Sequence, residues 1–220
     1  VEHAKDGMSA FVISNPSEIT ILFKGSYGIK KGTPQTWRDE WFKTNIPILR
    51  AMLSQERRIP SQLKTASTFL NHVINQFRGS RFYIYGHSLG SINAQFALAN
   101  CTHPEAIAAA YLYEGTNIWL LLTPKERRRV AQMRERIFNY VDIYDPVTLG
   151  ITETHHMVGK LCYVDSEPMQ PIKQHMWGGY QFNPDGSLKL RKIDQAFLAE
   201  SRSEHKLLSR SGELTDFIEK

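Results

Sequence analysis

Residues Arg81–Ala99, RFYIYGHSLGSINAQFALA, decide the fold. They begin with a short aromatic and β-branched run over Arg81–Tyr85, which is typical of a strand. The glycines of Gly86–Gly90 indicate a turn, and the small residues of Ser91–Ala99 predict a helix that can pack closely on a sheet. The sequence here therefore predicts a strand, a tight turn and a helix in immediate succession.

The turn has the form G-x-S-x-G, in which a serine sits on a strained strand-to-helix bend with its hydroxyl projecting from the sheet edge. Gly86 and Gly90 leave room for the strand and the helix to approach each other. The helix N-terminus directs N–H groups and a positive dipole end toward negative charge that develops at the serine. Ser88 is therefore the candidate nucleophile, although a serine in an ordinary turn is the alternative.

Strand-like and helix-like runs alternate along the rest of the chain, which is typical of an α/β fold with a mainly parallel sheet. Apolar spacing predicts helices over residues 61–77 and over Lys125–Phe138. Further strands are predicted at Ser9–Ser14, Glu18–Lys24, Ala106–Tyr113, Tyr140–Tyr144 and Lys160–Val164.

Length and composition fit a single globular domain over residues 1–220. The chain has 220 residues, 41% of them hydrophobic and 22% charged, whereas a typical domain has about 150 residues. No run approaches the roughly 20 apolar residues of a membrane span. Its two cysteines form neither a disulfide framework nor a zinc motif. We expect no metal and no organic cofactor.

The formal net charge is +5, and much of the positive charge lies in one segment. An anionic membrane surface is a better partner for such a segment than nucleic acid, which we do not expect the chain to bind. A solvated helix face is the more ordinary interpretation. The basic residues are Lys125, Arg127, Arg128, Arg129, Arg134 and Arg136, and they follow the apolar Trp119–Leu122.

A serine hydroxyl needs a base, and the base needs an acid to orient it. In folds that carry this motif, the acid follows the serine in the chain and the histidine follows the acid. Asp145 is favoured as the acid because it lies just beyond the predicted strand Tyr140–Tyr144, at the sheet edge where ligands bind. Asp142 is predicted inside that strand. It remains an alternative, together with Glu114 and Asp165.

His175 is the favoured base because it follows the last predicted strand and lies in a loop rich in glycine and aromatic residues. His155 and His156 precede that strand, and His205 lies in a polar tail. The backbone N–H of Leu89, directly after the nucleophile, is one expected oxyanion donor. Ser26, at the end of the run Phe23–Ser26, is the second, with a plain glycine turn as the alternative.

Several segments together resemble the class 3, fungal-type lipases. They are ILFKGS (residues 21–26) with Trp37-Arg38-Asp39 after it, YGHSLG (85–90), Glu114-Gly115 and VDIYDPV (141–147). The resemblance spans about residues 18–148 and implies an α/β-hydrolase fold with helices on both faces of the sheet. The chain departs from the family pattern at Ser91, after Gly115 and in HMWGGY (175–180).

The resemblance also implies the function. It gives Ser88 as nucleophile, Asp145 as acid, His175 as base and Ser26 as oxyanion residue, acting on lipid or other acyl esters. Secretion is implied by the family alone. More loosely, the chain is similar to lipase domains of bacterial secreted effectors that attack phospholipids. A thioesterase or peptidase with the same triad is an alternative, as is an inactive module that binds lipid or a protein partner.

Overall fold

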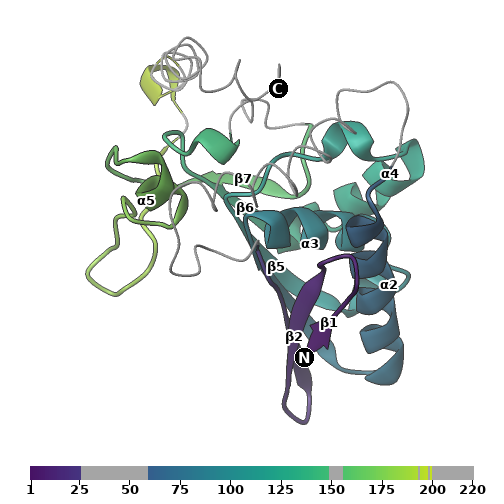
Figure 1. The fold of residues 1–220 in the computed structure, drawn as a ribbon. Helices are drawn as coiled ribbons and strands as arrows, with labels where there is room; N and C mark the ends of the chain where they lie inside the picture. The colour runs from purple at the N-terminus through teal and green to yellow at the C-terminus, as the bar shows by residue number, and fades with distance from the viewer. Residues whose placement is uncertain (26–58, 149–155, 193, 198, 200–220) are drawn as a thin grey trace.

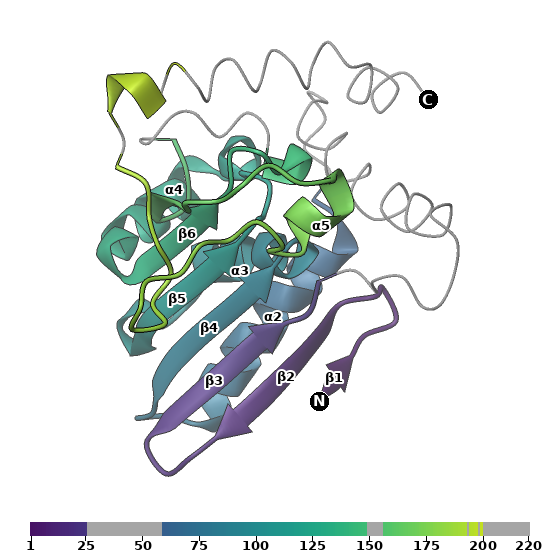
Figure 2. The same cartoon turned by 90° about the vertical axis from the view of Figure 1, so that its left-hand side faces the viewer.

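The computed structural model describes residues 1–25, 59–148, 156–192, 194–197 and 199. Within these residues seven strands form one sheet and lie side by side in chain order (Figures 1 and 2). They are β1 (Glu2–His3), β2 (Ser9–Ser14), β3 (Glu18–Phe23), β4 (Arg81–His87), β5 (Ile107–Tyr113), β6 (Ile137–Val141) and β7 (Lys160–Tyr163).

The first three strands pair antiparallel, whereas β3 to β7 are all parallel. This mainly parallel sheet confirms the α/β class predicted from the sequence. The β2–β3 hairpin follows from its turn residues, since the side-chain oxygen of Asn15 accepts the N–H groups of Ser17 and Glu18. The carboxyl ends of β4, β5 and β6 meet at one edge of the sheet, which is where ligands bind in such folds.

Helices lie on both sides of the sheet (Figure 1). On one face are α2 (Ser61–Gln76), α3 (Leu89–Ala99) and α4 (Pro124–Gln132), because right-handed crossovers between parallel strands in chain order all fall on the same side. The short α5 (Pro171–His175) lies on the other side. Leu70 of α2, Ile84 of β4 and Leu98 of α3 are fully buried in the core between helices and sheet.

The prediction of one helix over Lys125–Phe138 was wrong at its end. The helix α4 ends at Gln132, a 3-10 turn covers Arg134–Arg136, and β6 begins at Ile137. Val130, Met133 and Ile137 are all buried. Their spacing suits one face of a helix, but Ile137 is buried from a strand. The predicted strand Tyr140–Tyr144 consequently lies three residues earlier, so Asp142 directly follows β6 rather than lying within a strand.

Part of the basic segment is engaged within the fold. Arg129 donates to the carbonyl of Ala99, and Arg136 donates to the carbonyls of Pro104 and Ile107. Arg127 donates to the carbonyl of Trp119, and its guanidinium lies over the ring of that tryptophan. These arginines stabilise the fold. Lys125 and Arg128 are exposed.

The apolar residues just before α4 are divided between core and surface. Leu121 and Leu122 belong to the core, whereas Leu120 is 72% exposed. No helix in the described part of the chain is long and apolar enough to cross a membrane. In the same residues no cluster of three or more His, Cys, Asp or Glu side chains could hold a metal ion.

Candidate active site

Ser88 lies on a strained turn between β4 and α3. Its φ of 56° and ψ of −126° fall in a region that side chains other than glycine rarely adopt. Close approach of the chain on both sides requires the neighbouring glycines. A Cβ at Gly86 would overlap the carbonyl oxygen of Gly90, and one at Gly90 would overlap that of Phe23. The sequence G-x-S-x-G thus packs the turn against the end of β3.

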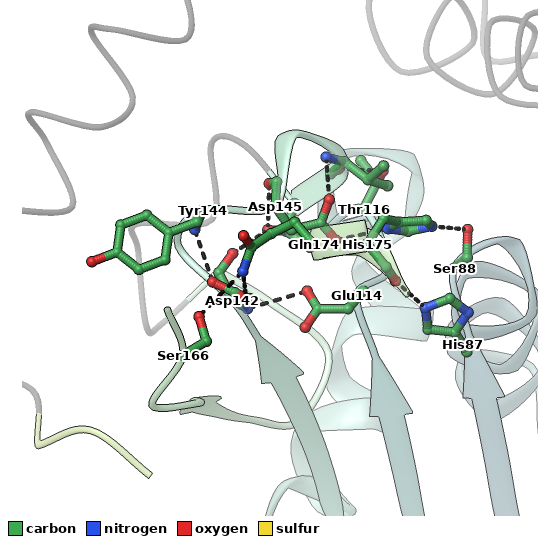
Figure 3. Close-up of polar contacts among 12 residues, drawn as sticks. His87, Ser88, Glu114, Thr116, Asp142, Tyr144, Asp145, Ser166, Gln174 and His175 are labelled. Carbon is green, nitrogen blue, oxygen red and sulfur yellow. Dashed lines mark hydrogen bonds and ion pairs between the residues drawn. The ribbon is translucent and has the colours of Figure 1, made fainter. Parts of the chain in front are cut away.

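His175, the last residue of α5, joins Ser88 to Asp145 (Figure 3). Its Nε2 lies 2.8 Å from Ser88 Oγ, and its Nδ1 lies 2.7 Å from Asp145 Oδ2. Because a carboxylate only accepts, Nδ1 carries the proton and donates it, which leaves Nε2 to accept the serine O–H. Exposure is 6% for Ser88, 4% for His175 and 0% for Asp145, so water competes little with these bonds.

Asp145 is held in the turn that follows β6. Its other oxygen, Oδ1, accepts the N–H of Val147 at 2.9 Å. Its own N–H donates to the carbonyl of Asp142, and the hydroxyl of Thr148 donates to the carbonyls of both aspartates. The carboxylate therefore has little freedom to turn away from His175.

His87 contacts His175 from the strand side. Its Nε2 donates to the carbonyl oxygen of His175 at 2.8 Å. The His87 ring lies 4.9 Å from the His175 ring and 4.5 Å from the Trp177 ring, centroid to centroid. Burial, and to a lesser extent the neighbouring His175, lower the pKa of His87 to about 4. His87 is therefore neutral at pH 7, with its one ring proton on the nitrogen that donates.

Glu114 and Asp142 form a second buried acidic layer beneath Asp145 (Figure 3). The carboxylate of Glu114, which directly follows β5, accepts the backbone N–H of Asp142 and the hydroxyl of Tyr180. Burial, and next the charge of Asp145, raise the pKa of Glu114 well above its usual range. Burial also raises the pKa of Asp142.

Backbone strain is concentrated around this site. Within the described residues, the non-glycine residues with positive φ are Ser88, Glu114 and Trp177. Ser88 and Glu114 follow adjacent strands, and Trp177 lies two residues after His175. Residues held in such conformations cluster at functional sites because the surrounding structure must enforce them.

The structure brings Ser88, His175 and Asp145 together, and two of the alternative residues lie at the surface. His156 is exposed, and Asp165 pairs with Lys189 at the surface. Asp142 and Glu114 are nearby, but within the described residues their side chains form hydrogen bonds with groups other than the His175 ring.

Leu89 is one of the two expected oxyanion donors. It begins α3, so its N–H has no partner within the helix. Gly25 lies against Ser88, and a Cβ there would be 3.6 Å from the Ser88 Cβ. The second expected donor, Ser26, lies outside the described residues, as do the alternative bases His155 and His205.

Sequence reasoning missed His87, Gln174 and Tyr180. Of these, the sequence could have indicated only His87, since it lies within the G-x-S-x-G motif beside the serine.

The chain matches no protein-family model and no curated protein sequence. The solved structures similar to it include those of three fungal proteins. A mutant of MDLA from Penicillium cyclopium is 15% identical with a TM-score of 0.44, and the alignment covers 86% of this chain and 67% of that one. The Lip2 lipase of Yarrowia lipolytica is 11% identical with a TM-score of 0.41, covering 76% and 63%.

The third is the Rhizomucor miehei lipase in complex with its propeptide, at 15% identity and a TM-score of 0.38, covering 74% of this chain and 53% of that one. The chain thus spans about half to two thirds of the length of these proteins. Its α/β class rests on the order and direction of its own strands.

Proposed function

We propose that this chain is a serine hydrolase that cleaves carboxylic esters of lipids. The observation that carries the proposal is the hydrogen-bonded chain from Ser88 through His175 to Asp145, with distances of 2.8 Å and 2.7 Å. Nucleophile, base and orienting acid at such distances are the general signature of an activated serine. The strained backbone at Ser88 supports the same role.

In the proposed reaction, Ser88 Oγ attacks the acyl carbonyl carbon while its proton passes to His175 Nε2. Asp145 keeps the His175 ring in the correct tautomer and stabilises the imidazolium that forms. The C–O bond to the leaving alcohol then breaks, and the alcohol takes the proton from Nε2. Water repeats the sequence on the acyl-enzyme, releasing the acid and restoring Ser88.

The tetrahedral intermediate carries negative charge on the former carbonyl oxygen. The backbone N–H of Leu89 is one proposed donor to it, assisted by the N-terminal end of α3. Ser26 is the other proposed donor, and the contact of Gly25 with Ser88 supports it because Ser26 is the next residue. Each such donor is typically worth about 10²–10³ in kcat.

A lipid ester is the favoured substrate because exposed apolar side chains flank the base. Met176 is 56% exposed and Trp177 is 44% exposed, directly after His175, and Met169 is 43% exposed on the same segment. Apolar residues beside a polar reaction centre suit an acyl chain. The resemblance of the sequence to class 3 lipases points to the same substrate class. We propose that the chain forms one catalytic domain. We also propose that this domain contacts an anionic membrane through the exposed Lys125 and Arg128.

Labelling with a fluorophosphonate probe tests the mechanism. The probe should attach to the wild-type chain and not to Ser88→Ala. Hydrolysis rates on matched acyl esters and thioesters of increasing chain length, and on peptides, then test the substrate. Absence of labelling, or equal labelling of Ser88→Ala, would overturn the serine mechanism. Preference for thioesters or peptides over esters would overturn the substrate class.

A further inference from the structure

The helix α5 delivers His175 to the site but is too short to hold its own position. It has five residues, from Pro171 to His175. Isolated helices shorter than about 12 residues are marginal in water. Contacts from outside the helix must therefore fix where His175 points.

The residue before His175, Gln174, makes such contacts with its whole side chain. Gln174 is 0% exposed. Its Oε1 accepts the N–H of Met169 at 2.5 Å, and its Nε2 donates to Asp142 Oδ2 at 2.6 Å and to Ser166 Oγ at 3.4 Å. Every polar group of this buried amide is thus engaged, which orients the amide uniquely.

Asp142 is itself fixed at the carboxyl end of β6. Its Oδ1 accepts the N–H of Tyr144 at 2.9 Å, while Oδ2 accepts from Gln174. Its backbone N–H donates to Glu114, which joins it to the end of β5. The carboxylate that receives Gln174 is therefore anchored to the sheet and not to a loose loop.

We propose that Asp142 is a positioning residue that acts through Gln174 to aim His175 at Ser88; this rests on the function proposed above. Two consecutive residues of α5 each bind a carboxylate of the turn after β6, Gln174 to Asp142 and His175 to Asp145. Consecutive helical side chains point about 100° apart, so the two bonds together prevent α5 from rotating about either one. A catalytic group displaced by about 1 Å can lose about 10²-fold in rate.

Exchanging the amide of Gln174 and the carboxylate of Asp142 tests the role of the hydrogen bond between them. In Asp142→Asn, one acceptor oxygen becomes a donor that faces either the Tyr144 N–H or the Gln174 amide. In Gln174→Glu, a second carboxylate faces Asp142 across the 2.6 Å contact. In the double variant the new amide at 142 donates to the new carboxylate at 174, and the N–H groups of Tyr144 and Met169 keep their acceptors.

We expect each single variant to lower kcat on a small soluble ester by about tenfold to a hundredfold with KM little changed, and the double variant to recover to within about threefold of wild type. Fluorophosphonate labelling rates should follow kcat. Melting temperatures show whether each variant is folded at the assay temperature. Asp165→Asn is the matched control, because this aspartate pairs with Lys189 at the surface side of the same segment; it should stay within about twofold of wild type.

Single variants that label at the wild-type rate would overturn the role of Asp142 and leave the serine mechanism intact. A double variant that folds but remains at least tenfold slower than the wild type would also overturn it, whether or not the single variants fold. A wild-type chain that does not label at Ser88 would instead overturn the proposed function on which the inference rests.

Discussion

Replacing His87 by glutamine should change how the stability of the fold depends on pH. Glutamine places an N–H donor where His87 Nε2 now donates to the carbonyl of His175, but it does not titrate. The pKa of His87 is lowered from its ordinary 6.5 to about 4, first by burial and then by His175. Between these two values the unfolded chain binds the proton and the folded chain does not.

Stability contributed by this histidine is therefore fully present above pH 6.5 and is lost as the pH falls from 6.5 toward 4. At about 1.4 kcal/mol per pH unit, a pKa lowered from 6.5 to about 4 corresponds to about 3 kcal/mol. For a domain of this size each kcal/mol shifts the melting temperature by about 2–4 °C. The wild-type melting temperature should thus fall by roughly 6–12 °C more than that of His87→Gln between pH 7 and pH 4.

Urea and thermal unfolding at several pH values between 4 and 7.5 would measure the difference. His103→Gln is the control, because it removes an exposed histidine whose partner is Glu105 at the surface. Its profile should keep the wild-type loss of stability that burial of neutral His87 causes between pH 6.5 and pH 4. If the His87→Gln profile is parallel to wild type, the reasoning that the fold buries a neutral His87 is refuted.

Three further predictions concern the acids and the basic surface. Asp145→Asn should lower kcat by about 10³–10⁴-fold with KM nearly unchanged, since the His175 ring loses its orienting acceptor; near-normal turnover of a soluble ester would contradict this. Glu114→Gln should abolish a decline in stability that begins as the pH rises above 4.5, because the raised pKa of Glu114 favours its protonated form in the fold; unfolding profiles that coincide at all pH values would count against it. Lys125→Gln combined with Arg128→Gln should remove a salt-sensitive preference for anionic over neutral vesicles while sparing a soluble ester; a wild-type chain equally active on both vesicle types would disprove membrane contact.

Local sequence signals were sufficient to predict the turn at Ser88 and most of the sheet, although they missed the two-residue β1 and placed β6 three residues too late. The strands over Ser9–Ser14 and Arg81–Tyr85 are recognised from short apolar runs bounded by turn residues, and the second extends to His87 in the structure. The glycines of the turn are required because a side chain there would overlap the backbone. These features depend on residues close together in the chain. The end of α4 cannot be predicted from such local signals. Val130, Met133 and Ile137 have the same spacing whether Ile137 is buried as part of a helix or as part of a strand.

That boundary removes the positional reason for which the sequence analysis favoured Asp145 over Asp142. With β6 ending at Val141, both Asp142 and Asp145 lie beyond the strand at the carboxyl edge of the sheet, and Glu114 lies at the same edge directly after β5. What distinguishes them is the partner that the fold supplies: the His175 ring for Asp145, the Gln174 amide for Asp142, and Tyr180 with a backbone N–H for Glu114. Gln174 and Tyr180 lie more than 25 residues after Asp145 in the chain, so no local pattern indicates that they contact these acids.

The carboxyl groups of Glu114, Asp142 and Asp145 are all buried near the His175 ring, and this burial affects which of them ionise readily. Ionised carboxylates at close quarters repel strongly in a poorly solvated site, so one of them holds its proton more tightly. Burial, and next the charge of Asp145, raise the pKa of Glu114 well above its usual range, and burial also raises the pKa of Asp142. A protonated Glu114 still accepts the N–H of Asp142 and can still bond Tyr180. Glu114 can thus hold the loop of Asp142 and Asp145 in place while its own ionisation beside His175 is disfavoured, so that the carboxylate bonded to the ring is the one that sets its orientation.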